Sequence, residues 1–195
     1  MKKIIGLFGL GTLLAASAAW AAPLEKAAFA AGCFWGTEEF FRKMDGVVKT
    51  EVGYEGGDKP TSYDQVGMGT TGHAETLELE YDPSKISYGQ LLERFFNMHD
   101  PTTANRQGND RGPQYRSAIF VHSDAQMKEA QEFKAKVEKS GAWKKPVVTE
   151  ITKAKTFYPA EKEHQDYLEK HPGGYDNHFD RHLSFDIKTR QEKSK

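Results

Sequence analysis

Cysteine is nearly missing from this chain, because Cys33 is the only one among 195 residues. A protein with one thiol cannot form an internal disulfide, so no disulfide framework holds the fold together. An excess of basic residues is missing too, since 27 Lys and Arg residues stand against 28 Asp and Glu residues, for a formal net charge of −1. This balance, without a basic cluster, argues against nucleic acid as the main partner. The lone thiol is therefore either buried or used in chemistry.

A long apolar run is also missing. Residues 4–14 form the best candidate, but they are too few and too rich in small side chains for a membrane span. Two lysines precede this run, and Ala19-Trp20-Ala21 follows it with the pattern of an export cleavage site. We therefore predict a signal peptide over residues 1–21, whose removal changes the net charge from −1 to −1 − 2 = −3. The mature chain is predicted to be a soluble, exported, periplasmic monomer that does not bind a membrane.

Cys33 lies where a predicted strand meets a predicted helix. Residues 26–31 form a short segment of mostly small side chains, as in a strand. Residues 37–44 place apolar side chains at helical spacing. Gly32 permits a tight turn between them. The free N–H groups and the positive end of a helix dipole favour a thiolate at such a position. The pattern thus favours a nucleophilic cysteine, and a buried structural thiol is the alternative.

A second alternative for Cys33 is lipidation. The sequence Ala30-Ala31-Gly32-Cys33 is similar to a lipoprotein processing site, in which the cysteine carries lipid and does no chemistry. Such a site directly follows the apolar run of the signal. Here Pro23, Glu25 and Lys26 lie between the two, which argues against lipidation.

Glu75 is the most informative carboxyl in the sequence. It begins a predicted strand over residues 73–81, and the alternation of strand side chains puts it on the same face as Leu77 and Leu79. Glu78 and Glu80 fall on the opposite, solvated face. A carboxyl at the edge of an apolar face loses hydration, which raises its pKa and keeps it protonated near neutral pH. Glu75 is therefore a candidate general acid, unless it simply reaches water at the end of the strand.

The remaining pattern predicts one α+β domain over residues 22–195, with a loose tail over about residues 183–195. Further strands are predicted over residues 47–54, 114–121 and 147–151, and capping boxes at Ser87 to Gln90 and Ser123 to Gln126 start two helices. A polar helix is predicted over residues 159–170, and two loops over residues 55–72 and 100–113. Tyr63 lies in the first loop, and Tyr115 lies in a strand beside Ile119. The order of elements predicts a two-layer sandwich with a mixed or antiparallel sheet, in the style of split βαβ, ferredoxin-like folds.

Several individually unusual motifs occur together over residues 26–168, and in this combination the chain resembles the peptide methionine sulfoxide reductase A family. The motifs are Gly32-Cys33-Phe34-Trp35-Gly36, Gly53-Tyr54-Glu55-Gly56-Gly57, Tyr63-x-x-Val66, Thr71-Gly72-His73-Ala74-Glu75, His99-Asp100-Pro101-Thr102, Gln107-Gly108-Asn109-Asp110 and Gln114-Tyr115-Arg116-Ser117. The resemblance implies reduction of the S epimer of methionine sulfoxide, free or in oxidised proteins and peptides, without a cofactor.

The resemblance also implies roles for particular residues. Cys33 attacks the sulfur and becomes a sulfenic acid, while Glu75 protonates the departing oxygen. By the same resemblance, the hydroxyls of Tyr63 and Tyr115 donate hydrogen bonds to that oxygen. The resemblance further implies that Phe34 and Trp35 are aromatic walls around the methyl group of the substrate. It implies that Asp110 contacts the substrate backbone.

The sequence departs from much of that family in its cysteines. Many relatives carry further cysteines near the C-terminus that attack the sulfenic acid, and this chain has none. Regeneration is therefore expected to use an external thiol through a mixed disulfide with Cys33. A thioredoxin-fold protein is the expected donor in an exported compartment, with a glutaredoxin or a small thiol as alternatives.

Other functions of the same residues remain open from the sequence. A cysteine hydrolase or acyl transferase would also use one thiol, but it needs a histidine as base. His73 and His99 lie within the matched motifs, either as members of a proton network or as ordinary loop histidines. His178 and His182 have the spacing of two zinc ligands on a helix, but they follow a Pro-Gly-Gly break, and we predict no metal site.

Overall fold

The protein is described from a computed structural model, which covers residues 23–186. Residues 1–22, with the predicted signal peptide, and residues 187–195 lie outside the described part. Six strands form the main sheet in the order β7-β6-β1-β3-β2-β8, and all neighbours are antiparallel except β6 and β7. These strands are β1 (Glu25–Ala31), β2 (Val47–Glu55), β3 (Ala74–Tyr81), β6 (Ser117–Val121), β7 (Glu150–Lys153) and β8 (Tyr158–Pro159).

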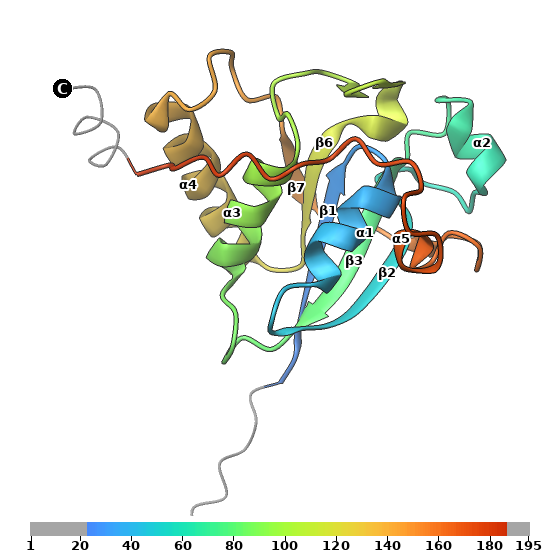
Figure 1. The fold of residues 1–195 in the computed structure, drawn as a ribbon, viewed down its shortest axis with the longest axis horizontal. Coiled ribbons are helices and arrows are strands. Elements are labelled where there is room, and N and C mark those ends of the chain that lie inside the picture. The colour runs from blue at the N-terminus through green and yellow to red at the C-terminus, as the bar shows by residue number, and fades with distance from the viewer. Residues whose placement is uncertain (1–22, 187–195) are drawn as a thin grey trace, which may run out of the picture.

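The predicted split βαβ arrangement is confirmed. Helix α1 (Phe34–Arg42) connects β1 to β2, and helix α3 (Tyr88–Met98) connects β3 to β6. Because β1 and β2 are each antiparallel to β3, they run parallel to one another with β3 between them. Helix α4 (Asp124–Ser140) follows β6 and packs on α3 (Figure 1). The domain is thus a mixed sheet with these helices on one face.

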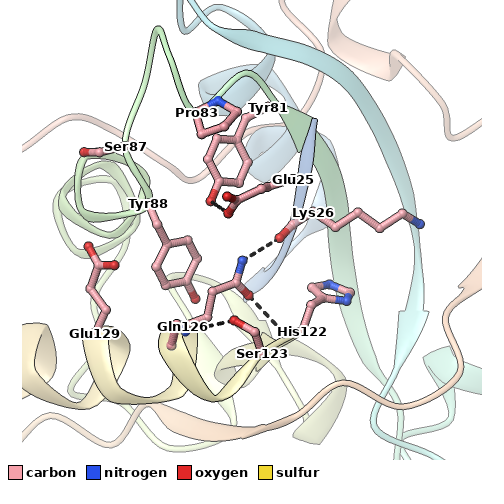
Figure 2. Close-up of a pocket in the computed structure, with 11 residues that line it drawn as sticks. Glu25, Lys26, Tyr81, Pro83, Ser87, Tyr88, His122, Ser123, Gln126 and Glu129 are labelled. Atoms are coloured by element: carbon pink, nitrogen blue, oxygen red, sulfur yellow. Dashed lines mark hydrogen bonds between the residues drawn. The ribbon is translucent and has the colours of Figure 1, made fainter. Parts of the chain in front are cut away.

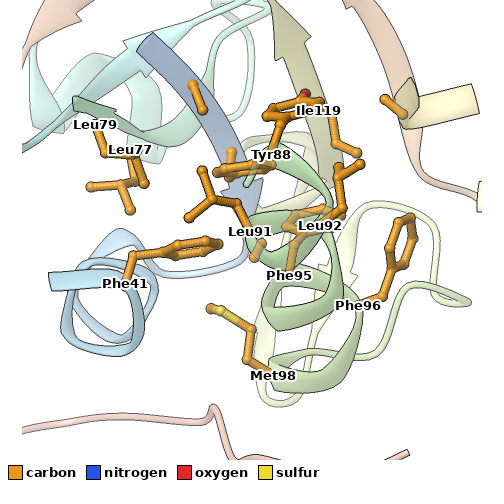
Figure 3. Close-up of a cluster of buried hydrophobic side chains, with 14 of the residues drawn as sticks. Phe41, Leu77, Leu79, Tyr88, Leu91, Leu92, Phe95, Phe96, Met98 and Ile119 are labelled. Atoms are coloured by element: carbon orange, nitrogen blue, oxygen red, sulfur yellow. The ribbon is translucent and has the colours of Figure 1, made fainter. Parts of the chain in front are cut away.

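The core lies between that face and the helices. Figure 3 shows Leu77 and Leu79 of β3 directed toward Phe41 of α1 and the apolar stripe of α3. The Phe29 ring of β1 stacks on Phe41 at 4.9 Å and packs against Phe95 at 5.3 Å. All of these side chains are buried, which confirms the predicted core face of β3. This packing fixes the end of β1 against the start of α1, where Cys33 lies.

The two predicted capping boxes differ in the structure. At α3 the box is complete, because the Ser87 hydroxyl accepts from Gln90 N–H and the Gln90 side chain accepts from Ser87 N–H. At α4 the Ser123 hydroxyl accepts from Gln126 N–H, but the Gln126 amide instead donates to the Lys26 carbonyl and accepts from His122 N–H. That side chain thus holds α4 to β1. Gly141 ends α4 in the left-handed region, at φ 61°.

The predictions for the two loops and for the strand over residues 114–121 need correction. The loop over residues 55–72 contains a short helix, α2 (Tyr63–Gly67), and the loop over residues 100–113 contains a small hairpin of β4 (Arg106–Gln107) and β5 (Asp110–Arg111). Strand β6 begins only at Ser117. Tyr115 belongs instead to η1, a 3₁₀ turn over Pro113–Tyr115, because Pro113 lacks the N–H that a strand ladder needs.

The predicted helix over residues 159–170 is wrong. Residues 158–159 form β8, and only α5 (Tyr167–Lys170) is helical. Asp166 has φ 53°, a left-handed conformation that a right-handed helix cannot contain. The amide of Gln165 explains the break, since it accepts from Val52 N–H at 2.9 Å and donates to the Val52 carbonyl at 2.8 Å. The side chain thus satisfies backbone groups of β2 as another strand would.

The predicted strand over residues 147–151 is shifted, since β7 covers Glu150–Lys153. Residues 183–186, the described part of the predicted loose tail, are packed against the domain, and the rest of the tail lies outside the described residues. The Arg181 N–H donates to the Asn97 carbonyl, Leu183 N–H donates to Asn97 Oδ1, and Phe185 is buried against Phe133. No helix within residues 23–186 is long and apolar enough to cross a membrane.

Candidate active site

Cys33 stands at the turn between β1 and α1, as predicted. It is the residue that precedes the first turn of α1, and its side chain is 7% exposed. Gly32 has φ 100°, and a Cβ atom there would lie 2.6 Å from the Gln107 side chain. Only glycine meets both conditions. The turn therefore depends on Gly32 and on the close approach of the β4 hairpin.

Glu75 lies beside this turn. Its side chain is 3% exposed, and Oε2 accepts a hydrogen bond of 3.0 Å from the N–H of Phe34, the residue after Cys33. Burial raises the pKa of Glu75 to about 8, although the Phe34 hydrogen bond opposes that shift. The alternative of a solvated strand-end carboxyl is excluded by this burial. Glu75 is a neutral carboxylic acid near pH 7, within reach of whatever the thiol binds.

The expected stabilisation of a Cys33 thiolate is outweighed by burial. Burial raises the pKa of the thiol well above its ordinary value, and the charge of Glu75 adds to this rise. The backbone N–H groups of Trp35 and Gly36 act in the predicted direction and lower the pKa, but they are outweighed. The helix start therefore only moderates the effect of burial on the pKa of the thiol.

The hydroxyls of Tyr63 and Tyr115 approach the same place from two different elements. Burial raises the pKa of Tyr63 to about 12, and the charge of Glu75 is the second cause. Burial is also the main cause that raises the pKa of Tyr115. The charge of Glu75 is the second cause, and Cys33 adds a smaller rise. No hydrogen bond ties either hydroxyl to another described residue, so both hydroxyls are free to donate to a bound molecule.

Tyr63 is positioned by Glu161, a residue that no sequence pattern singles out. One Glu161 oxygen accepts from the Tyr63 N–H at 3.0 Å, and the other accepts from the Tyr54 hydroxyl at 2.9 Å. This carboxylate lies in the segment predicted to be helical, and it anchors the start of α2 to strand β2.

Phe34 and Trp35 form an aromatic wall, and His164 completes it. The His164 ring stacks on Tyr63 at 4.2 Å and lies 5.5 Å from Phe34, and its Nδ1 accepts from the indole N–H of Trp35 at 3.2 Å. Burial lowers the pKa of His164, so its ring is neutral at pH 7. Tyr167 of α5 also stacks on Trp35, with ring centroids 3.8 Å apart. An apolar group bound near Cys33 meets these rings.

Asp110 is held by the C-terminal segment. The Tyr175 hydroxyl donates to Asp110 Oδ1 at 2.8 Å, and the Asn177 side-chain amide donates to Oδ2 at 2.7 Å. The Asp110 charge raises the pKa values of Cys33, Glu75 and Tyr115, which places it at the same site. The structure thus brings all the predicted site residues together.

His178 contacts the backbone directly before the turn that carries Cys33. Its side chain is fully buried, Nε2 lies 2.8 Å from the Ala31 carbonyl, and Nδ1 lies 2.8 Å from Asp176 Oδ1. Burial acts to raise the pKa of Asp176, but the His178 hydrogen bonds lower it, so the carboxylate is ionised. Both ring nitrogens therefore lie beside oxygen atoms of other residues. Through these two contacts His178 clamps the strand directly before Gly32.

The other histidines have structural partners. The His99 ring is bonded to the Phe95 carbonyl at 2.7 Å and to the Ser117 hydroxyl at 2.8 Å, and burial lowers its pKa to about 3. His73 is bonded to the Lys59 carbonyl at 2.8 Å and accepts from Gly57 N–H at 3.2 Å. The His182 side chain is 84% exposed, whereas that of His178 is buried. The two residues do not lie on a helix, so they do not form the pair that their spacing suggested.

These contacts decide between the chemical alternatives. Among the described residues no histidine forms a hydrogen bond with the Cys33 thiol, so the base that a cysteine hydrolase needs is lacking there. A thiol, a neutral carboxylic acid and two free phenols instead converge, with apolar rings beside them. This set suits attack on a polarised sulfur with protonation of the oxygen that leaves.

The residues that sequence reasoning missed come mainly from the last part of the chain. His164, Tyr175 and Asn177 lie more than 70 residues from Glu75 and carry no local pattern that indicates a site. His178 was singled out only for its spacing to His182, and the structure gives it a different role.

Comparison with known proteins agrees with this geometry. A family model described as peptide methionine sulfoxide reductase matches residues 25–195. A curated relative from Methanothermobacter thermautotrophicus, named peptide methionine sulfoxide reductase MsrA, is 55% identical over 76% of this chain and 88% of its own. One from Mycolicibacterium paratuberculosis with the same name is 54% identical over 80% of this chain and 89% of its own.

Solved structures are similar as well. The reduced form of Mxr1 from Saccharomyces cerevisiae superposes with a TM-score of 0.76 at 43% identity, over 81% of this chain and 92% of that one. A structure of Mxr1 in complex with Trx2 has a TM-score of 0.56 at 31% identity, over 85% of this chain and 96% of that one. The site around Cys33 and these matches agree, and the chain belongs to the peptide methionine sulfoxide reductase A family as a thiol-dependent methionine sulfoxide reductase.

Proposed function

We propose that this protein reduces the S epimer of methionine sulfoxide, free or in oxidised proteins, with Cys33 as nucleophile and Glu75 as general acid. In the overall step Cys33–SH and the sulfoxide give Cys33–SOH and a thioether, so the oxygen moves from one sulfur to the other and two electrons leave Cys33. Glu75 gives its proton to the oxygen, and the thiol proton returns the carboxylate to its acid form.

The observation that carries this proposal is the buried Glu75 carboxyl bonded to the residue after Cys33. A sulfoxide oxygen is a poor leaving group unless it is protonated as charge develops. A carboxyl with a pKa raised to about 8 by burial is largely protonated at neutral pH, where an exposed one is ionised. Tyr63 and Tyr115 would donate hydrogen bonds to the same oxygen, because their hydroxyls have no partner among the described residues.

The aromatic wall supports a role in choosing the substrate. Phe34 and Trp35 would surround the methyl group on the sulfur, and His164 and Tyr167 keep the Trp35 ring in place. Asp110 would contact the backbone of the bound residue, since Tyr175 and Asn177 orient its carboxylate. An alkyl group larger than methyl would clash with these rings.

We propose regeneration by an external thioredoxin-fold protein. The chain has one cysteine, so no second thiol of its own can attack the Cys33 sulfenic acid. The donor thiol forms a mixed disulfide with Cys33 and releases water, and its second thiol frees Cys33. The complex of the yeast relative with Trx2 supports a thioredoxin partner over a glutaredoxin or a small thiol.

We also propose that the protein is exported to the periplasm and cleaved after Ala21. The lysines, the apolar run and the Ala19-Trp20-Ala21 pattern support this, and all of them lie outside the described residues. The mass of the protein recovered from the periplasmic fraction tests it. A chain that keeps residues 1–21 would contradict the proposal.

One anaerobic turnover tests the reaction scheme. The reduced protein is mixed with excess methionine (S)-sulfoxide without a reductant, and methionine and trapped sulfenic acid are counted per chain. One of each is expected, with no product from the R epimer. More than one methionine per chain, or none from the intact protein, would contradict the single-thiol scheme. Cys33→Ser, which keeps the shape of the site, is expected to form no methionine.

A further inference from the structure

The three groups proposed to act on the sulfoxide oxygen come from three different elements. Tyr63 begins α2, Tyr115 ends η1, and Glu75 lies in β3. Residues 68–73 connect α2 to β3, whereas η1 is more than 30 residues further along the chain. The spacing of the three groups therefore depends on what holds η1 against α2 and against this connection.

Gln114 stands directly before Tyr115 and joins η1 to the end of α2. It is 4% exposed, and its Nε2 donates to the carbonyl of Gly67, the last residue of α2, at 3.2 Å. A helix as short as α2 is not stable through its own hydrogen bonds, so contacts with other elements fix its place. Glu161 holds its start through the Tyr63 N–H, and Gln114 holds its end.

The backbone around the Gln114 amide leaves room for it and for nothing larger. Gly112 has φ 137°, and a Cβ atom there would collide with Gln114 Oε1. Gly69, in the connection after α2, has φ 72°, and a Cβ atom there would lie 3.2 Å from the same oxygen. That oxygen is buried and has no hydrogen-bond partner among the described residues. The one bond that the buried amide makes is thus the bond to Gly67.

Arg116 stands directly after Tyr115 and joins the same turn to the approach of β3. Its side chain is 13% exposed. Nη1 donates to the carbonyl of Pro113 in η1 at 2.9 Å, and Nη2 donates to the carbonyl of Gly72 at 3.0 Å. Gly72 lies three residues before Glu75. The planar guanidinium thus bonds two backbone segments at once, which a single ammonium group does poorly.

We propose that Gln114 is a positioning residue for sulfoxide reduction. It holds the end of α2 against η1, and this sets the spacing of the Tyr63 and Tyr115 hydroxyls so that both reach one oxygen. Arg116 supports the same turn against the segment that leads to Glu75. The inference rests on the proposed function, because Gln114 acts through these hydroxyls and not on the substrate. A group displaced from its productive position loses much of its effect on the rate.

Gln114→Met tests the inference, because it removes the N–H donor and keeps the length and burial of the side chain. We expect the first turnover at saturating methionine (S)-sulfoxide, measured by rapid quench, to slow about tenfold, since both hydroxyls are displaced. The half-saturating concentration of the sulfoxide is expected to stay within about twofold, because the hydroxyls bind the oxygen most strongly when it carries charge. A wild-type rate in Gln114→Met would overturn the inference.

A double-mutant cycle separates positioning from a general structural effect. Tyr63→Phe and Tyr115→Phe are each expected to slow the first turnover. In the chain that carries both of these substitutions, Gln114→Met is expected to add less than about a twofold loss, because no hydroxyl remains to be displaced. The full tenfold loss in that chain would overturn the inference. Wild-type rates in both single tyrosine variants would instead remove the hydroxyls from the proposed reaction, and the inference with them.

Gln126 provides the matched control, since it is another buried glutamine that joins two elements. Figure 2 shows its amide between β1 and α4, where it donates to the Lys26 carbonyl at 2.7 Å and accepts from His122 N–H at 2.9 Å. This contact lies at the opposite end of β1 from Cys33. Gln126→Met is expected to lower the melting temperature at least as much as Gln114→Met, and to leave the first turnover within about twofold of wild type. Equal losses of rate in the two variants would overturn the inference.

Arg116→Lys decides the case if Gln114→Met does not fold. Lysine keeps the positive charge beside Glu150 but cannot bond the Pro113 and Gly72 carbonyls together. We expect the first turnover to slow about fivefold, and Arg116→Lys to add no further loss to Tyr115→Phe. A wild-type rate in Arg116→Lys, or an undiminished loss in the Tyr115→Phe chain, would contradict the positioning role of this turn.

Discussion

At the scale of single residues, burial raises the pKa values of both Cys33 and Glu75. Taking both groups out of water favours their neutral forms, a thiol and a carboxylic acid. For Glu75 this is the form that a general acid needs. For Cys33 it is the less reactive form, so the attack depends on a proton acceptor that appears only as the substrate oxygen takes the Glu75 proton.

Glu75→Gln removes the acid and keeps the size and burial of the side chain. We expect the first turnover, measured by rapid quench as methionine formed per chain, to slow by a factor of about 10²–10⁴ at pH 7. Glu78→Gln, on the same strand but on the opposite face, serves as the matched control and is expected to stay within twofold of wild type. An unchanged rate in Glu75→Gln would remove Glu75 from its assigned role.

His178 is a second residue whose role follows from its contacts. His178→Ala removes the clamp on the Ala31 carbonyl and leaves the partly buried Asp176 carboxylate without its side-chain partner. Loss of a buried partner costs several kcal/mol, and since Asp176 keeps some contact with water we expect about 2 kcal/mol in the free energy of unfolding, measured with urea.

The exposed His182→Ala is the control for this measurement and should change stability by less than about 0.5 kcal/mol. An unchanged stability in His178→Ala would contradict the clamp.

At the scale of elements, α1 is the piece whose position determines the site. It presents Cys33 at its start, packs Phe41 into the core, and allows the C-terminal segment to lie against its first turn. Gly36 makes that last contact possible, because a Cβ atom there would collide with the Asp176 carboxylate and the His178 ring.

Gly36→Ala therefore tests the docking of the C-terminal segment on α1. We expect the added methyl group to displace the segment at a cost of about 1–3 kcal/mol, and to lower kcat/KM because Asp110 loses the supports of Tyr175 and Asn177. Gly67→Ala in α2 is the control, since a Cβ atom there meets nothing within 4 Å. Equal stability of Gly36→Ala and wild type would show that the segment does not press on α1.

The elements also show how far the sequence alone could lead. The strand that carries Glu75 and the stripe of α3 were predictable because their apolar residues repeat with the period of the element that they form. The position of Tyr115 near the site was predicted for the wrong reason, since it lies in a 3₁₀ turn and not in the strand. The break at Asp166 was not predictable, because it depends on Gln165 pairing with Val52 more than 100 residues away.

At the scale of the whole molecule, carboxyls that are neutral in the folded state make stability depend on pH. Burial raises the pKa of Glu75 to about 8 and the pKa values of Glu38 and Glu55 to about 7. Above an unfolded value near 4.5 the folded protein therefore binds more protons than the unfolded chain, so stability falls as pH rises toward 7–8. His99 acts oppositely, but mainly below pH 6.5, since burial lowers its pKa to about 3.

In the window from pH 6.5 to 8.5 the carboxyls dominate, because His99 is already half deprotonated in the unfolded chain at pH 6.5 and adds only about 0.4 kcal/mol of the opposite sign. We expect the free energy of unfolding, from urea titrations at the two pH values, to fall by roughly 1–3 kcal/mol over this range. Glu75→Gln cannot titrate and should show a smaller fall, and Glu38→Gln should remove a further part at the lower end of the window. Glu132→Gln, which removes an exposed carboxyl of α4 that pairs with Lys128, should leave the fall unchanged. A stability that is constant or rises from pH 6.5 to 8.5 in the wild type would mean that these carboxyls are ionised in the folded protein, and Glu75 would then have no proton to give at neutral pH.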